Sequence, residues 1–152
     1  MHAFEDLMTA LKESNRPYDF DKITEAYQYA SKAHEGQMRQ SGDPYITHPI
    51  AVAQILVELG MDTETICAGL LHDVVEDTAS TLDEIKKRFG ADVALMVDGV
   101  TKLTKMTYSS KEQRQAENVR KMLLAMAKDV RVIIVKLADR LHNRRTGEYW
   151  KE

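Results

Sequence analysis

Residues 130–141 read VRVIIVKLADRL, and the interpretation of this stretch decides the fold class. Its first half is rich in β-branched residues, which are enriched in strands. Apolar residues nevertheless recur at the helical spacing i, i+3, i+4, i+7, i+8 and i+11. They are Val130, Ile133, Ile134, Leu137, Ala138 and Leu141. The stretch therefore predicts a helix whose apolar stripe faces the core.

The same helical period continues outward over most of the chain. Asp19 or Asp21 provides a cap for one helix, and residues 81–84 (TLDE) form a capping box that opens another. Residues 37–47 are predicted to be a loop, and residues 104–110 are polar and expected to be mobile. We expect an all-α bundle of about seven or eight helices. The predicted helices cover residues 4–11, 19–36, 48–59, 63–76, 81–90, 93–103, 111–128 and 130–141.

Length and composition restrict the class of protein. The 152 residues fit one domain of ordinary size, which can bury a core without disulfides. The single cysteine, Cys67, excludes a disulfide framework within the chain and favours a reducing compartment. A net charge of −3 argues against a general nucleic-acid binder, and no run of about 18 apolar residues is present to span a membrane. Because residues 1–6 also lack the pattern of a signal peptide, we expect a cytoplasmic protein.

The chemically informative stretch is residues 70–78, LLHDVVEDT. At about 100° per residue, four polar side chains of one predicted helix fall within an arc of roughly 140°. They are His72, Asp73, Glu76 and Asp77. No lysine or arginine occurs between residues 60 and 83 to balance the carboxylates, so a divalent metal is the economical partner. The alternative is an acidic, solvated helix face with an incidental histidine.

Two further positions bear on this choice. His48 lies at the start of a predicted helix, after a loop that contains glycine and proline, and such a histidine is often a cap or a surface residue. Asp139 interrupts a strongly apolar helix, with Asn143 one turn later on the same face. The alternative for Asp139 is a buried carboxylate paired with Arg140 or Lys136. The residues alone leave these alternatives open.

The order His48, His72-Asp73 and Asp139 resembles the H…HD…D pattern of the HD-domain metal phosphohydrolases. Four stretches narrow the resemblance to the hydrolase domain of the RelA/SpoT family, whose members are (p)ppGpp synthetases and hydrolases. These stretches are residues 36–49 (GQMRQSGDPYITHP), 71–78 (LHDVVEDT), 98–103 (DGVTKL) and 135–143 (VKLADRLHN). They occur in the family's order, and the resemblance extends from residue 20 to residue 146.

This resemblance implies an HD-domain helical bundle with (p)ppGpp 3′-pyrophosphohydrolase activity. The family's domain removes the 3′-diphosphate of this alarmone of the stringent response, which gives GDP or GTP and pyrophosphate. Measured against the family, residues 1–152 are expected to form one HD-type hydrolase domain that is shortened at its C-terminal end. No synthetase domain is expected in this chain.

The resemblance also implies a metal cofactor and its ligands. The implied cofactor is one Mn²⁺ ion, although mixed imidazole and carboxylate ligands also suit Fe²⁺ or Zn²⁺. Glu76 and Asp77 match the family's Glu-Asp pair, which positions or deprotonates the attacking water. The implied metal ligands are His48, His72, Asp73 and Asp139.

Four more residues match family positions on the substrate side of the site. Arg39 would stack on the guanine, and Ser41 lies where the family's loop touches the base. Asn143 lies where the family contacts the sugar and phosphate region, and Lys136 would add positive charge near the phosphates. The alternative for Lys136 is a solvated or ion-paired helix face. Gln40 departs from the family, since many relatives carry a lysine there.

Three functions are consistent with these observations. The first is metal-dependent hydrolysis of (p)ppGpp, which the loop around Arg39 and Ser41 favours. The second is an HD phosphohydrolase for another nucleotide, and the third is a catalytically silent helical domain that binds nucleotide or a partner. The expected partner is the small-molecule nucleotide (p)ppGpp, without membrane binding or direct nucleic-acid binding. The motifs give no prediction of oligomeric state.

Overall fold

A computed structural model describes residues 3–105, 120 and 130–146. These residues form eight helices and no strand, and their one extended pairing is an isolated bridge between Met38 and Pro44. The predicted all-α fold is therefore confirmed. No helix in this part of the chain combines the length and the hydropathy that a membrane crossing needs. The helices are α1 (Ala3–Glu13), α2 (Phe20–Ala33), α3 (Thr47–Glu58), α4 (Thr63–Leu71), α5 (Val74–Asp77), α6 (Leu82–Phe89), α7 (Ala91–Lys105) and α9 (Arg131–Thr146).

Local capping signals place several helix ends where the sequence predicts them. The Asp19 side chain accepts a hydrogen bond from the Lys22 amide at the start of α2, and Thr81 and Glu84 form the predicted capping box of α6. Helix α7 begins two residues before and ends two residues after the predicted bounds of residues 93 and 103, and near its end the Thr104 hydroxyl donates to Val100 O. The helix predicted over residues 111–128 lies outside the described residues, apart from residue 120.

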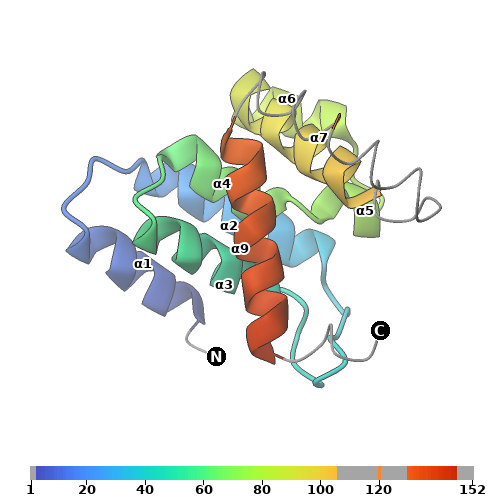
Figure 1. The fold of residues 1–152 in the computed structure, drawn as a ribbon, viewed down its shortest axis with the longest axis horizontal. Coiled ribbons are helices and arrows are strands. Elements are labelled where there is room, and N and C mark those ends of the chain that lie inside the picture. The colour runs from blue at the N-terminus through green and yellow to red at the C-terminus, as the bar shows by residue number, and fades with distance from the viewer. Residues whose placement is uncertain (1–2, 106–119, 121–129, 147–152) are drawn as a thin grey trace.

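Helix α4 lies at the centre of the fold and packs against α2, α3, α7 and α9 (Figure 1). Every residue from Thr65 to Leu71 is buried. Gly69 permits the close approach of α3, since a Cβ atom at this position would lie 2.6 Å from Leu56 Cδ1. Gly99 serves the same purpose between α7 and α9, where a Cβ atom would lie 2.8 Å from Val132 Cγ2. The two glycines thus allow two close helix contacts, between α3 and α4 and between α7 and α9.

Helix α9 confirms the helix predicted from residues 130–141, but only part of the predicted stripe, Ile133, Ile134 and Ala138, packs against the core. Leu137 is 60% exposed and Leu141 is 40% exposed. The inner face instead includes two polar residues among apolar ones. Its buried residues are Val132, Val135, Ala138, Asp139 and Asn143. Because apolar side chains lie on every side of this helix, their period predicted the helix and could not identify the face that packs inward.

Candidate functional site

The four predicted metal ligands come from three parts of the sequence and meet where α3, α4 and α9 pack together. His48 is the second residue of α3, His72 and Asp73 lie between α4 and α5, and Asp139 lies in α9. One ligand atom of each residue lies within 4.8 Å of the others. The fold therefore brings all four residues into one group.

The junction between α4 and α5 corrects the prediction of a single helix over residues 63–76. Helix α4 ends at Leu71, and α5 begins at Val74. The ring nitrogen Nδ1 of His72 donates to Gly69 O over 2.6 Å, and this carbonyl is the one that the Asp73 amide would use in an unbroken helix. The same hydrogen bond directs His72 Nε2 toward Asp139, at 3.2 Å from its Oδ1 atom. The break thus orients a candidate ligand.

Two imidazoles and two carboxylates are in contact within this group. His48 Nε2 lies 2.6 Å from Asp139 Oδ1, and His72 Nε2 lies 3.2 Å from the same oxygen. The distance from Asp73 Oδ2 is 3.2 Å to His72 Nε2 and 3.9 Å to His48 Nε2. The two histidines are only 2% and 1% exposed, and His48 is not the N-cap of α3. Neither the surface alternative for His48 nor the solvated-face alternative for His72 fits this structure.

The electrostatics of the group favour positive charge. Burial opposes ionisation of Asp73, yet the His72 imidazolium outweighs burial and lowers the pKa of Asp73 to about 2. Burial is likewise outweighed at Asp139, where hydrogen bonds from the two histidines hold the pKa well below its usual range. Burial lowers the pKa of His48, whereas the two carboxylates overcome burial and raise the pKa of His72. The two ionised carboxylates therefore favour a positively charged group next to them.

The donor set fits a divalent cation. Imidazole nitrogens and carboxylate oxygens suit Mn²⁺, Fe²⁺ and Zn²⁺ alike. Further side chains hold the donors from behind: His142 Nδ1 lies 2.7 Å from His48 Nδ1, and Lys136 Nζ lies 3.2 Å from Asp139 Oδ2. Such contacts orient ligands in metal sites. The group formed by His48, His72, Asp73 and Asp139 is a candidate site for a divalent metal.

The position of Lys136 is compatible with both interpretations of Asp139, as a metal ligand and as a buried carboxylate paired with a basic residue. Its ammonium pairs with Asp139 Oδ2, while the other carboxylate oxygen faces the histidines. The same ammonium donates to Thr104 Oγ1 over 2.9 Å. Lys136 is therefore ion-paired in this structure, beside the candidate metal site.

Glu76 and Asp77 lie in α5, within one turn of Asp73, and both side chains are exposed. Partial burial and then the negative charge of Asp73 raise the pKa of each carboxyl group. The Tyr45 hydroxyl donates to Asp73 Oδ2 over 2.7 Å and lies 3.2 Å from Asp77 Oδ2. A raised pKa makes a carboxylate a stronger base, which suits general-base chemistry beside a metal site.

The structure brings two of the predicted substrate-side residues together and leaves a third apart. Arg39 is only 8% exposed, and its Nη2 atom donates to Asn143 Oδ1 over 2.8 Å. Asn143 Nδ2 in turn donates to Asp139 Oδ1 over 3.4 Å. Ser41 lies on the exposed turn of the loop, where its hydroxyl donates to Asp43 Oδ2. Arg39 and Asn143 thus connect the loop to the metal ligands.

Two residues of this site have no role in the sequence prediction. His142 contacts His48, and Tyr45 contacts both Asp73 and Asp77. His142 lies three residues after Asp139 in a helix, and this spacing is a signal that could have placed both on one side of α9. Tyr45 belongs to a predicted loop, whose sequence has no period from which its contacts follow.

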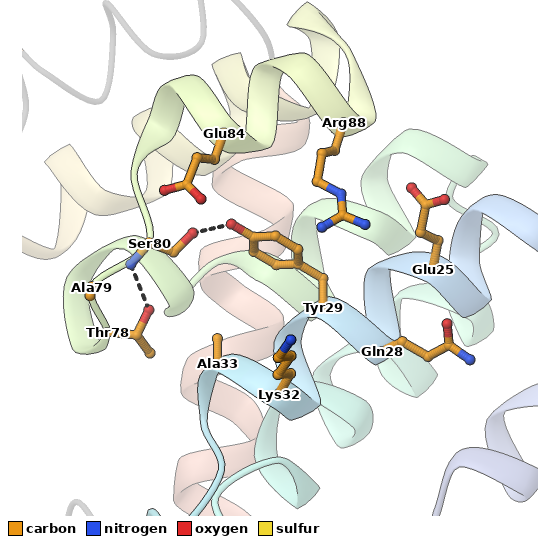
Figure 2. A pocket seen from close by; sticks show the side chains of 10 residues that line it. All are labelled: Glu25, Gln28, Tyr29, Lys32, Ala33, Thr78, Ala79, Ser80, Glu84 and Arg88. Carbon is orange, nitrogen blue, oxygen red and sulfur yellow. Dashed lines mark hydrogen bonds between the residues drawn. The ribbon is translucent and has the colours of Figure 1, made fainter.

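A cavity of about 550 Å³ lies next to the residues that follow Asp77, between α2 and α6 (Figure 2). Lys32 and Arg88 contribute to its lining, and the Arg88 guanidinium lies over the Tyr29 ring, 5.1 Å from its centroid. The hydroxyl groups of Tyr29 and Ser80 are in contact across it. None of the four candidate metal ligands lines this cavity, so it is separate from the metal site.

A His-Asp pair at a helix junction, joined by a histidine from α3 and an aspartate from α9, defines the site of an HD-domain protein. Comparison with known families agrees, since residues 26–150 match the sequence profile of the family described as HD domain. Among curated proteins, the chain is 50% identical over 146 residues to the bifunctional (p)ppGpp synthase/hydrolase SpoT of Escherichia coli K12. It is 55% identical over 137 residues to a GTP pyrophosphokinase of Myxococcus xanthus.

These matches cover 96% and 88% of this chain, but only 21% and 18% of the two relatives. The chain thus spans about a fifth of their length. A solved structure of a metazoan ortholog of SpoT that hydrolyses ppGpp has a TM-score of 0.66 and 34% identity. That match covers 86% of this chain and 71% of the other. The chain belongs to the RelA/SpoT family of HD-domain proteins.

Proposed function

We propose that this chain hydrolyses the 3′-diphosphate of (p)ppGpp to give GDP or GTP and pyrophosphate. The observation that carries the proposal is the group of two histidines and two aspartates, three of them buried, with Glu76 and Asp77 on the adjoining turn. The names of several relatives support the substrate, because they describe guanosine-3′,5′-bis(diphosphate) 3′-pyrophosphohydrolases. In this reaction water attacks the phosphorus bonded to the 3′ oxygen, the bond between them breaks, and the 3′ oxygen leaves with a proton.

We propose His48, His72, Asp73 and Asp139 as the ligands of one Mn²⁺ ion. When bound, such an ion lowers the pKa of a water molecule and neutralises charge on the diphosphate. The contacts behind the ligands support this assignment. Gly69 O holds His72 Nδ1, so the Nε2 atom of the neutral ring is left as the donor to a metal.

Glu76 and Asp77 are proposed to orient the attacking water and accept its proton. The direction of these shifts supports the role, because a raised pKa makes each carboxylate a stronger base. Both carboxylates are exposed, so a substrate and a water molecule can approach them. Neither belongs to the group of four ligand residues.

The substrate-side residues are proposed to hold the nucleotide against this centre. Arg39 presents a planar guanidinium suited to stacking on guanine, and its hydrogen bond to Asn143 fixes its position. Asn143 is proposed to contact the sugar and phosphate region, and Lys136 to exchange its pairing with Asp139 for a phosphate contact. Ser41 is proposed to touch the base from the exposed turn of the loop.

The test is pyrophosphate release from ppGpp by the purified, Mn²⁺-loaded protein. We expect turnover by the wild type, loss of turnover in Asp73→Ala, and unchanged turnover in Asp83→Ala, which removes an exposed carboxylate from α6. Reconstitution of the metal-free protein with Mn²⁺, Fe²⁺ and Zn²⁺ in turn tests the metal. A metal-loaded wild type that releases no pyrophosphate would refute the proposed function, and full activity in Asp73→Ala would refute the proposed site.

A further inference from the structure

Two side chains of the loop of residues 37–45 contact the turn that carries Asp77, and each contact is called a tie below. The first tie is formed by Tyr45, whose hydroxyl lies 2.7 Å from Asp73 Oδ2 and 3.2 Å from Asp77 Oδ2. The second is formed by Gln37, whose Nε2 atom donates a hydrogen bond to Asp77 O over 3.0 Å. The carboxylate and the backbone of Asp77 are thus both held by side chains from one loop.

His34 holds both of these side chains in place. Its Nδ1 atom donates to Gln37 Oε1 over 3.0 Å, which fixes the orientation of the amide so that Nε2 faces Asp77. Its ring packs against that of Tyr45, with the centroids 4.7 Å apart. His34 is only 2% exposed, so it acts as a buried support at the end of α2. The two side chains that contact Asp77 are therefore both held by His34.

Backbone hydrogen bonds close the loop and place Arg39 beside these ties. Tyr45 N donates to Gln37 O, and Arg39 N donates to Asp43 O, each over 2.9 Å. Arg39 thus lies inside a hydrogen-bonded loop whose first and last residues, Gln37 and Tyr45, both contact Asp77. Arg39 and the two residues that contact Asp77 therefore belong to the same hydrogen-bonded loop.

We propose that Tyr45 is a positioning residue, which with Gln37 fixes the carboxylate of Asp77 for the hydrolytic step and connects it to the base-binding loop. This inference rests on the proposed function, since it assigns Tyr45 a role in that same reaction. A phenol hydroxyl that faces two carboxylates limits the rotation of both. Tyr45 is not expected to contact the reacting atoms.

The decisive variant is Tyr45→Phe, which removes one hydroxyl and keeps the ring against His34. At saturating Mn²⁺, we expect kcat for ppGpp hydrolysis to fall about tenfold to a hundredfold, with KM nearly unchanged. The matched control is Tyr18→Phe, because the Tyr18 hydroxyl also makes one 2.7 Å hydrogen bond, to Met61 O, away from the site. Both variants should lose similar thermal stability, and Tyr18→Phe should keep its kcat. Wild-type kcat in Tyr45→Phe, or an equal loss in both variants, would overturn the proposal.

A double-mutant cycle tests whether Tyr45 acts through Asp77. In an Asp77→Asn background, Tyr45→Phe should cause little further loss of kcat, because the group that it positions is already altered. Independent, multiplicative losses would overturn the proposed coupling.

A third measurement separates this inference from the proposed function. If the metal-loaded wild type releases no pyrophosphate, the proposed function fails, and hydrogen exchange then tests the tie by itself. The amides of Asp77 and Thr78 bond to Asp73 O and Val74 O, at 2.9 and 3.1 Å. They should exchange faster in Tyr45→Phe than in wild type or Tyr18→Phe. Equal exchange in all three proteins would refute the tie.

Discussion

Two groups of charged side chains lie beside the short helix α5, and they are built differently. In the candidate metal site before α5, the charged groups are largely buried and lie within 3.2 Å of a partner. In the cavity after α5, Lys32 and Arg88 are exposed and form no ion pair within the described residues. Buried charges are stable only with fixed partners, whereas exposed charges are solvated wherever they lie. The difference indicates that the candidate catalytic site is distinguished by charged groups that already have fixed hydrogen-bond or ion-pair partners. Charge alone and cavity volume do not distinguish it.

The largest expected effect comes from breaking the metal site at Asp139. Asp139→Ala removes the oxygen that both His48 Nε2 and His72 Nε2 face. Calorimetric titration should show Mn²⁺ affinity lowered more than about a hundredfold, with hydrolysis lost in parallel. Asp139→Asn keeps the volume of the side chain and serves as a second variant if the alanine variant unfolds. Tight Mn²⁺ binding in both variants would remove Asp139 from the ligand set.

The variant Glu76→Ala tests whether catalysis can be lost while metal binding is kept. Glu76→Ala should lower kcat by about a hundredfold to ten-thousandfold, as loss of a general base does, while metal content stays at the wild-type level. The side chain is exposed, so the free energy of unfolding should change by less than about 0.5 kcal/mol. Glu35→Ala, another exposed glutamate, is the control. Loss of the metal from Glu76→Ala would instead make Glu76 a ligand.

Much of the fold could be predicted, because helical period and capping are local properties of the sequence. The capping box at Thr81 and the helix over residues 130–141 both follow from short-range spacing. The inward face of α9 could not be predicted this way. Asp139 and Asn143 face inward because other elements supply their partners, and a rule that places apolar residues inside puts Leu137 there instead.

The candidate site was likewise only partly predictable from the sequence. The structure brings together the four residues that the motifs suggest as ligands, although they are separated by up to 91 residues. The break at His72 could not be foreseen, because neither the break nor the side-chain hydrogen bond to Gly69 O beside it follows from the spacing of apolar residues. The role of Tyr45 depends on how a loop folds against α5, and loop residues follow no period.

Arg39 is expected to show a smaller effect than the metal-site residues, on a different kinetic constant. Arg39→Ala should raise KM for ppGpp about tenfold and leave kcat within about twofold, since it removes stacking and not a group at the reacting bond. Gln40→Ala is the matched control, because it changes the next, exposed residue of the same loop. A loss confined to kcat would contradict base stacking, and it would favour a role of Arg39 in positioning Asn143 and Asp139.

The smallest effect is expected at the cavity, and it tests the other half of the comparison. The double variant Lys32→Ala/Arg88→Ala removes both cations from the lining shown in Figure 2. These cations are exposed and have no ion-pair partner in the described residues, so kcat and KM for ppGpp should stay within about twofold of wild type. Loss of the Arg88 contact with the Tyr29 ring should lower the free energy of unfolding by about 0.5–1 kcal/mol. A large fall in kcat at unchanged stability would show that the cavity acts on Asp77 through residues 78–80, and that fixed partners are not what separates the two groups.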